Sequence, residues 1–377
     1  MNILMVTPHL PPYQAANALL PHLLGREMTA RGHRTTYLTF GTEGSGAEVV
    51  HVRRRPRKWR ATRIPQALEA AETWWKGGPL VRQADVVHIH SNTWMNQVAA
   101  RLAIQHGKPY LLTHYGTEIW HHDGKDEVFR RLNAEARHVT FYSQALLDRG
   151  RELGVPTRAS CVVYPPVADS FHPLDEAARQ EARRRYVPEG GVLLLNVKRL
   201  HPLADQATLI EAMALVRRER RDAVLLIAGI GGAEKDLRAQ AARHGLERAV
   251  RFLGLVPNDQ VAVLQAAADL FVLSSVLEAT PTVALEALAA GTPVVSTDNP
   301  GGLELRGIFG DEVAVVPKKD PGALATRILA FLAAPRRVGP KARRILEDRF
   351  RLRGVADRYL ALYMETALPT TEETAGA

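Results

Sequence analysis

The sequence has 377 residues, of which 46% are hydrophobic and 24% are charged, as is typical of globular proteins. This length is sufficient for two domains of ordinary size. A single cysteine, Cys161, excludes an internal disulfide and favours a reducing compartment. The sequence contains no run of about 18 apolar residues without a charge, so no membrane span is expected. The start, Met-Asn-Ile-Leu-Met-Val, is expected to be a first strand rather than a signal peptide. We therefore expect a cytoplasmic globular protein.

The formal net charge is +9, and the excess of positive charge is concentrated in the first half. Residues 1–172 contain 21 Lys and Arg against 14 Asp and Glu, which gives +7. The segment 51–82 contains nine against two, which also gives +7. Such a cationic surface attracts anionic partners. Nucleic acid is not an expected partner, because no reader motif for it is present.

Short apolar runs alternate with helical patterns along the whole chain, which indicates α/β architecture with parallel sheets. Each half is expected to be a doubly wound, Rossmann-like sheet. The expected strands of the first half are Ile3–Thr7, Thr35–Phe40, Asp85–His90, Tyr110–His114, Val139–Ser143 and Ala159–Tyr164. Those of the second half are Val192–Val197, Ala223–Gly229, Val250–Leu253, Leu270–Ser274, Pro293–Ser296 and Val313–Val316.

The domain boundary is predicted where prolines interrupt the periodicity, between Pro165 and Pro173. The first domain then covers residues 1–170 and the second covers 171–352. The tail 369–377 is expected to be disordered. Ligands of doubly wound sheets bind beyond the carboxyl ends of the strands. We therefore expect the chemistry in a cleft between the two domains.

A basic arm, Arg53–Arg60, leads into a helical pattern that carries Trp74 and Trp75. Two interpretations stay open. In the first, the arm and helix dock on an anionic membrane surface, at the inner face of the membrane, or guide an anionic acceptor. In the second, the helix packs its aromatic face on the sheet and the arginines are solvated.

Histidines end two neighbouring strand candidates of the first half. His88 and His90 lie on one strand, but no third ligand has a convincing spacing, so a metal site is not expected. His114 ends the next strand, where it is able to donate a hydrogen bond to a sugar hydroxyl or to a reacting centre.

In the second half, two carboxylates lie eight positions apart across a loop that feeds a helix. Glu278 lies in the loop, and Glu286 lies one turn into the helix. The free N–H groups at a helix N-terminus bind anions, and a carboxylate accepts hydrogen bonds from hydroxyls. Phosphate at the helix tip and a diol beside it are the two features of a nucleotide sugar. Lys198 and Arg199 follow the first strand of this half, and a fixed cation there would stabilise a leaving diphosphate.

These motifs occur in an order and spacing that resemble a known enzyme family, the retaining glycosyltransferases of family four, which have the GT-B fold. The resemblance covers nearly the whole chain. The segments that carry it are Asn196–Leu200, Leu226–Gly231, Phe252–Gly254, Ala268–Ser275, Glu278–Glu286, Ala287–Val295, Gly301–Glu304 and Val316–Asp320, with Thr113–Trp120 in the first half. The C-terminal helix, about residues 353–368, usually packs back on the first domain in this fold.

The resemblance also implies roles for individual residues. Glu286 would bind the ribose hydroxyls of the donor, and Glu278 would lie near the transferred sugar. The catalytic candidates are His114, Lys198, Arg199 and Glu278. The donor-binding candidates are Gly229, Gly231, Leu253, Gly254, Thr280, Pro281, Thr282, Val283 and Glu286. The acceptor-side candidates are Gln14, Asn17, His90, Tyr115 and Glu118.

The chain departs from the family pattern in three places. Ala279-Thr280-Pro281 replaces a glycine-containing segment, and proline has no N–H to donate. Ala204 occupies the position of a lysine, which Lys198 would replace. Gln14 to Asn17 replaces a pair of glycines, whose absence limits the approach of the backbone to a donor.

The predicted function is retaining transfer of a hexosyl or N-acetylhexosaminyl group from a nucleoside-diphosphate sugar to a hydroxyl acceptor. A UDP-sugar is the expected donor, and no metal or other cofactor is expected. Two alternatives stay open, a GT-B epimerase or hydrolase of nucleotide sugars and a non-catalytic nucleotide-sugar-binding subunit.

Overall fold

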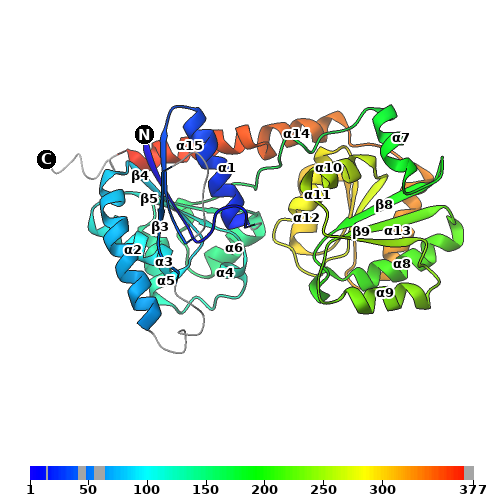
Figure 1. The fold of residues 1–377 in the computed structure, drawn as a ribbon, viewed down its shortest axis with the longest axis horizontal. Coiled ribbons are helices and arrows are strands. Elements are labelled where there is room, and N and C mark those ends of the chain that lie inside the picture. Colours follow the sequence, from blue (N-terminus) through cyan, green and yellow to red (C-terminus); the bar gives the residue numbers. More distant parts are fainter. Residues whose placement is uncertain (14–15, 41–47, 55–63, 369–377) are drawn as a thin grey trace. The chain divides into compact units, whose positions relative to one another are not determined.

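The computed structural model describes residues 1–13, 16–40, 48–54 and 64–368. The chain forms two compact units (Figure 1). The first unit comprises Met1–Pro166 together with Leu352–Ala377, and the second comprises Val167–Arg351. The predicted boundaries lie at residues 170 and 352.

The first unit is built on a seven-stranded parallel sheet with the order β3-β2-β1-β4-β5-β6-β7. Its strands are β1 (Asn2–Thr7), β2 (Arg34–Thr39), β3 (Glu48–His51), β4 (Val86–His90), β5 (Tyr110–His114), β6 (His138–Phe141) and β7 (Ser160–Val162). Every strand expected in this half is present. Only β3 was not predicted, because this four-residue edge strand has no buried residue to mark it in the sequence.

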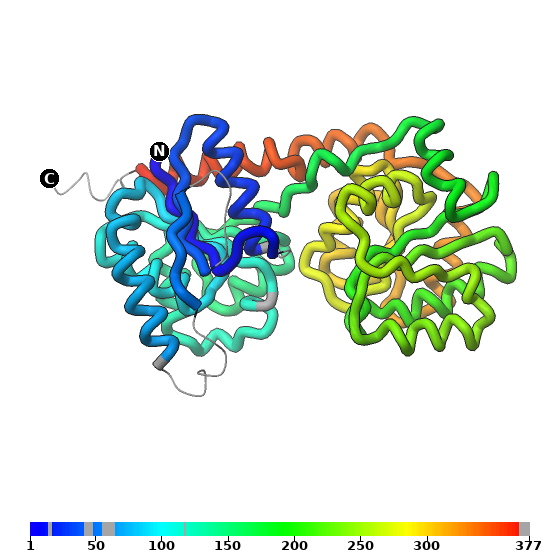
Figure 2. Tube along the Cα trace, viewed as in Figure 1, coloured from blue at the N-terminus to red at the C-terminus, as the bar shows by residue number. Residues whose placement is uncertain are grey.

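Helices cover this sheet: α1 (Ala16–Ala30), α2 (Ile64–Gln83), α3 (Trp94–Gln105), α4 (Thr117–Trp120), α5 (Glu127–Glu135), α6 (Gln144–Glu152) and α15 (Leu352–Ala367). The C-terminal helix α15 packs against α1, β4 and β5. Figure 2 shows this last segment, in red, returning to the N-terminal unit. Tyr359 and Tyr363 of α15 are completely buried there, so the helix contributes to the core of this unit.

The second unit contains a six-stranded parallel sheet with the order β10-β9-β8-β11-β12-β13. Its strands are β8 (Val192–Val197), β9 (Ala223–Ala228), β10 (Val250–Gly254), β11 (Leu270–Leu273), β12 (Val294–Thr297) and β13 (Val313–Val316). All of them were predicted. Consecutive residues of β8, such as Leu193, Leu194 and Leu195, are fully buried, as expected of a parallel sheet that is covered on both faces.

Its helices are α7 (Glu176–Arg184), α8 (Gln206–Glu219), α9 (Glu234–Arg243), α10 (Asn258–Ala267), α11 (Thr282–Ala289), α12 (Pro300–Phe309), α13 (Pro321–Ala333) and α14 (Pro340–Phe350). Helix α8 packs against α9 and α13, and α10 packs against α7 and α11. In each sheet, the strand order reverses between two neighbouring strands, β1 and β4 in the first unit and β8 and β11 in the second. Ligand sites of such sheets lie where this reversal occurs, at the carboxyl ends of the strands.

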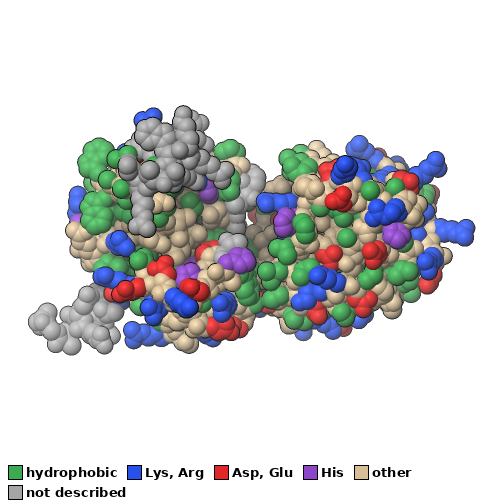
Figure 3. Space-filling view, turned by 90° about the horizontal axis from the view of Figure 1, so that it is seen from below, with side chains coloured by type: hydrophobic (Ala, Val, Ile, Leu, Met, Phe, Trp, Pro, Cys, Tyr) green, Lys and Arg blue, Asp and Glu red, His purple; other side chains and the backbone are tan. Residues whose placement is uncertain are grey.

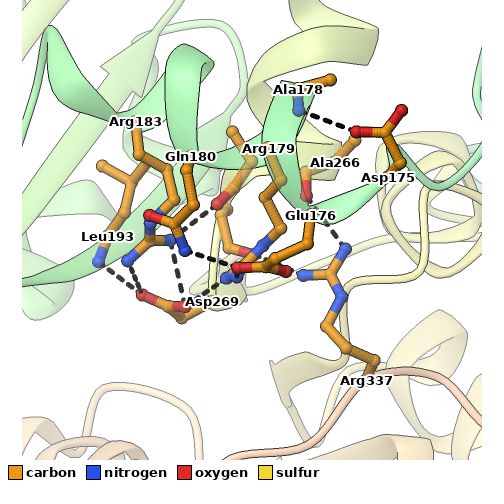
Figure 4. A network of polar contacts seen from close by, with 12 residues as sticks. Asp175, Glu176, Ala178, Arg179, Gln180, Arg183, Leu193, Ala266, Asp269 and Arg337 are labelled. Atoms are coloured by element: carbon orange, nitrogen blue, oxygen red, sulfur yellow. Dashed lines mark hydrogen bonds and ion pairs between the residues drawn. The ribbon is translucent and has the colours of Figure 1, made fainter. Parts of the chain in front are cut away.

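An ionic network lies at the other end of the second sheet, beside the amino ends of its strands (Figure 4). Asp269, just before β11, accepts hydrogen bonds from Arg179 at 2.6 Å and Arg183 at 2.8 Å, both on α7, and from the N–H of Leu193 at 2.8 Å. Arg337 donates to the carbonyls of Ala268, Ala266 and Ala290. The network joins α7 to the amino ends of β8 and β11, so it orients these strands without touching their carboxyl ends.

Candidate active site

The carboxyl ends of β8 and β11 bring together two of the residues predicted to be catalytic. Lys198 follows β8 directly, and its Nζ lies 2.6 Å from Oε1 of Glu278, in the loop after β11. The side chains are 28% and 12% exposed, so the ion pair is accessible at one side. A ligand that carries both phosphate and hydroxyl groups would contact the Lys198 ammonium with its phosphate and the Glu278 carboxylate with a hydroxyl.

Two predicted donor-site glycines allow the chain after β9 to lie against the chain after β8. A Cβ on Gly229 would lie 2.1 Å from the carbonyl oxygen of Lys198, and one on Gly231 would lie 2.1 Å from that of Leu200. Gly229 also has φ of +145°, and its N–H donates to the carbonyl of Gly254 at 2.8 Å. Any side chain here would displace the backbone that presents Lys198.

Helix α11 begins at Thr282 with an open N-terminus. Its N-cap residue is Pro281, which makes no side-chain capping bond. The N–H groups of Thr282 and Val283 have no hydrogen-bond partner among the residues that the structure describes. Free N–H groups at the start of a helix, together with the helix dipole, favour an anion. The proline therefore removes one donor from the loop but leaves the two helix donors available.

Glu286 lies on the second turn of α11 and has no side-chain partner within the described parts of the chain. The residue keeps some exposed surface, whereas its carboxyl group is largely surrounded by protein. This burial raises the pKa of Glu286 to about 7. A buried carboxyl group without a partner is unfavourable for folding, so a ligand hydroxyl that supplied a hydrogen bond would be favoured.

A cluster of buried polar side chains fixes the loop that carries Glu278. Asn299 is fully buried and donates to the carbonyl of Ser275 at 3.2 Å and to Oγ1 of Thr297 at 2.9 Å. Its Oδ1 accepts from the N–H of Gly302 and thereby caps α12, while the N–H of Gly301 donates to the carbonyl of Glu278 at 2.9 Å. Asn299 was not among the predicted site residues, although Asn-Pro before Gly-Gly is a typical helix start.

Arg199 and Ala204 differ in accessibility. Arg199 is exposed, and its guanidinium has no partner among the described residues, so it is available to an anion. Ala204 is 4% exposed, and its carbonyl accepts from Oγ of Ser274 at 2.9 Å. The side chain at position 204 thus points into the protein, whereas Lys198 supplies a cation at the strand end.

In the first unit, His114 ends β5 and lies in the core. Its ring has no exposed surface and lies between Phe129 and Phe141, with centroids 5.8 and 5.4 Å away. Its Nε2 lies 2.9 Å from Oδ1 of Asn133, and its Nδ1 lies 3.9 Å from Glu118. Burial lowers the pKa of His114, against the opposing effects of Glu118 and Asn133. The structure thus buries the His114 ring, and the catalytic role of His114 stays a prediction.

His90, an acceptor-side candidate, is also fully buried. Its Nδ1 lies 2.6 Å from the hydroxyl of Tyr115, and its ring stacks at 3.8 Å on that of His88. His88 lies 2.6 Å from the hydroxyl of Tyr363 and 2.7 Å from that of Thr113. Burial lowers the pKa of both histidines, that of His90 to about 3. The structure thus buries His90, and its place on the acceptor side stays a prediction.

The other acceptor-side candidates keep some exposed surface. Tyr115 and Glu118 are partly exposed at the end of β5, and Glu118 accepts from the N–H of Tyr115 at 2.7 Å. Asn17 is partly exposed near the start of α1. Gln14 lies outside the described residues, as do positions 55–60 of the basic arm and the tail 369–377. Among the described residues, no three His, Cys, Asp or Glu side chains are placed to hold a metal ion together.

Both halves of the chain match models of glycosyltransferase families. A family described as glycosyl transferases group 1 matches residues 178–349, and one described as glycosyltransferase family 4 matches residues 22–171. The glycogen synthase of Mycobacterium tuberculosis is 32% identical over 293 residues, which cover 74% of this chain and 68% of that protein. The chain therefore belongs to the group 1 glycosyltransferases of family 4, as the sequence motifs predicted.

Another relative and two solved structures extend the comparison. A GDP-mannose-dependent phosphatidylinositol monomannoside mannosyltransferase of M. tuberculosis is 28% identical over 325 residues, covering 80% of this chain and 82% of that protein. HepE of Anabaena in complex with UDP has a TM-score of 0.78 at 20% identity, covering 97% of this chain and 100% of that one. Sucrose-phosphate synthase of Thermosynechococcus elongatus has a TM-score of 0.76 at 21% identity, covering 97% and 98%. The GT-B fold is thereby confirmed.

Proposed function

We propose that this glycosyltransferase moves a hexosyl or N-acetylhexosaminyl group from a UDP-sugar to a hydroxyl acceptor with retention of configuration. The observation that carries the proposal is the grouping of Lys198, Glu278 and the open N-terminus of α11. All three lie at the carboxyl ends of the strands of the second sheet. The cation and the helix N–H groups suit a diphosphate, and the two glutamates suit the hydroxyls of a sugar and a ribose.

In the proposed reaction, the bond between the anomeric carbon and the diphosphate oxygen breaks, and a bond from that carbon to the acceptor oxygen forms on the same face. The acceptor proton passes to the leaving diphosphate, so no protein nucleophile is needed. Lys198 and Arg199 stabilise the negative charge that develops on the diphosphate. The transfer itself does not require His114, which is buried in the first unit.

Positive charge from side chains also supports the proposal that no metal is required. Lys198 and Arg199 are adjacent, and only Lys198 has an ion-pair partner within the described residues. Turnover is expected to survive a chelator. Complete loss on chelation, restored by magnesium or manganese, would contradict this part of the proposal.

A donor screen analysed by mass spectrometry tests the proposed function. Slow hydrolysis of a UDP-sugar by the full-length protein, and faster loss when a hydroxyl acceptor is added, is the expected result. If GDP-mannose alone were turned over, the donor would be GDP-mannose and not a UDP-sugar. GDP-mannose is the donor named for the mycobacterial mannosyltransferase. A change in sugar stereochemistry without transfer would favour the epimerase alternative, and binding without turnover would favour the non-catalytic subunit.

A further inference from the structure

Helix α2 of the first unit exposes large apolar side chains in its middle, although it buries Val81 near its C-terminal end. Trp75 is 75% exposed, Leu68 is 47% exposed and Trp74 is 44% exposed. On the opposite side, Thr73 is fully buried, and Glu69 is 5% exposed. This polarity is the reverse of that expected for a helix that covers a sheet. It contradicts the interpretation in which the tryptophans pack on the sheet.

Close packing explains why the small residues lie inside. A Cβ on Gly77 would lie 3.1 Å from Leu38 of β2 and 3.3 Å from Leu102 of α3. The hydroxyl of Thr73 is satisfied within the helix, because it donates to the carbonyl of Glu69 at 2.8 Å. The buried side of α2 is thus complete without its aromatic residues, and Trp74 and Trp75 are left for another partner.

Cations flank this apolar face. The N–H of Arg53 donates to Glu72 at 3.1 Å, and Nζ of Lys76 donates to the carbonyl of His51 at 2.6 Å, so the chain before α2 lies along the middle of the helix. The side chains of Arg53 and Arg54 are exposed there, and Arg82 is exposed in the last turn. Glu72 is paired with Lys76, and Glu69 is buried.

We propose that this face, made of Leu68, Trp74, Trp75, Arg53, Arg54 and Arg82, docks on an anionic lipid surface. Tryptophan inserts its ring at the level of the headgroups, and arginine contacts the phosphates beside it. Charge complementarity decides between the possible occupants, because a second copy of this basic chain would bring the same positive charge to the face. Hydrophobic side chains are visible on the surface of the first unit in Figure 3.

Lipid binding at this face would make a hydroxyl-bearing acceptor in or on a membrane accessible to the first unit. That consequence rests on the proposed function, whereas the docking itself does not. No helix within the described residues is long and apolar enough to cross a bilayer.

Co-sedimentation with vesicles tests the docking without any need for catalysis. The full-length protein should sediment with vesicles that contain phosphatidylglycerol, remain free of pure phosphatidylcholine vesicles, and dissociate at high salt. Replacing both tryptophans, Trp74→Ser and Trp75→Ser, should lower the partition coefficient on the order of tenfold. Replacing Arg53→Gln and Arg54→Gln should lower it about fivefold per cation.

Matched variants elsewhere in the first unit control for a general loss of charge or apolar surface. Met364→Ser removes an exposed apolar side chain from α15, and Arg130→Gln with Arg131→Gln removes two exposed cations from α5. These controls should bind as the unmodified protein does. Equal binding by the tryptophan variant would overturn the proposal. So would a concentration-dependent dimer, formed without lipid and lost in that variant, because the face would then bind a second copy.

Discussion

The carboxyl ends of the two sheets carry polar residues of similar chemistry but differ in their access to solvent. At the second sheet, Lys198, Glu278 and Arg199 all keep exposed surface, and the adjoining helix offers free N–H groups. At the first sheet, His90 and His114 have none. Tyrosines of α15 and phenylalanines of the flanking elements occupy the space around the histidines of the first unit.

The difference shows that residue type and position at a strand end do not by themselves determine whether a side chain is accessible to a ligand. A histidine is a good proton donor or acceptor only where a ligand reaches it. In the first unit, desolvation lowers the pKa of His90 and His114 and favours the neutral ring, which is the state of a core residue. The two regions should therefore respond differently to substitution: one in turnover, the other in stability.

The largest effect is expected for Arg199→Ala, at one of the accessible residues beside the second sheet. Its charge matters most as the diphosphate leaves, so kcat should fall about 10²- to 10³-fold while the free energy of unfolding changes little. Steady-state kinetics and urea unfolding measure the two quantities. Arg218→Ala, an exposed cation on α8, is the matched control and should leave kcat unchanged. A change confined to KM would make Arg199 a binding residue only.

The second prediction concerns His114, one of the buried histidines of the first unit. His114→Ala would leave a cavity beside Phe129 and Phe141 and remove the partner of Asn133. The free energy of unfolding should fall by about 3 kcal/mol, while kcat at a temperature where the variant is folded should stay near that of the unmodified protein. His121→Ala, an exposed histidine of the same unit, is the control. A stable, folded His114→Ala protein with kcat reduced a hundredfold would support the predicted catalytic role.

The features that could be predicted from the sequence also differ between the two regions. Every expected strand formed, because buried parallel strands have long apolar runs, and Gly229 and Gly231 lie where the motif required backbone contact. The roles of His90 and His114 could not be assessed, because their burial depends on Tyr115, Asn133 and other residues distant in sequence. The exposure of Trp75 was also not predictable, because the helical pattern does not say which face meets the sheet.

The two regions should also differ in how stability depends on pH. Burial raises the pKa of Glu286 from 4.5 to about 7, so the folded second unit binds more protons than the unfolded chain between these values. Its stability should therefore fall by about 3 kcal/mol as the pH rises from 4.5 to 7. In the first unit, the folded-state pKa values of His88 and His90 lie below 6.5, so its stability should fall as the pH drops below that value.

Glu286→Gln separates the two contributions, because it removes the first dependence and leaves the second. Hydrogen exchange of α11 and of β4, followed between pH 5 and 8, reports the two units separately. The affinity for a nucleotide sugar, whose phosphates do not titrate in this range, should also rise through pH 7 in the unmodified protein and not in Glu286→Gln. A pH-independent affinity in both proteins would refute the ribose-binding role of Glu286.

The smallest effect is expected for Tyr363→Phe, which removes one hydroxyl from the buried residues around His88 and keeps the ring. The hydroxyl of Tyr363 lies 2.6 Å from Nδ1 of His88, whose other nitrogen contacts Thr113. The variant would leave this nitrogen without that partner in a site that water does not reach, so the free energy of unfolding should fall by about 1 kcal/mol. Tyr13→Phe, at a tyrosine that is 53% exposed, is the control and should change it by less than about 0.5 kcal/mol. Urea unfolding at pH 8, where the histidines are neutral in both states, isolates this hydrogen bond from protonation. Equal stabilities for the two variants would mean that the hydrogen bond to Tyr363 does not stabilise the buried histidines, and that packing alone keeps them from the solvent.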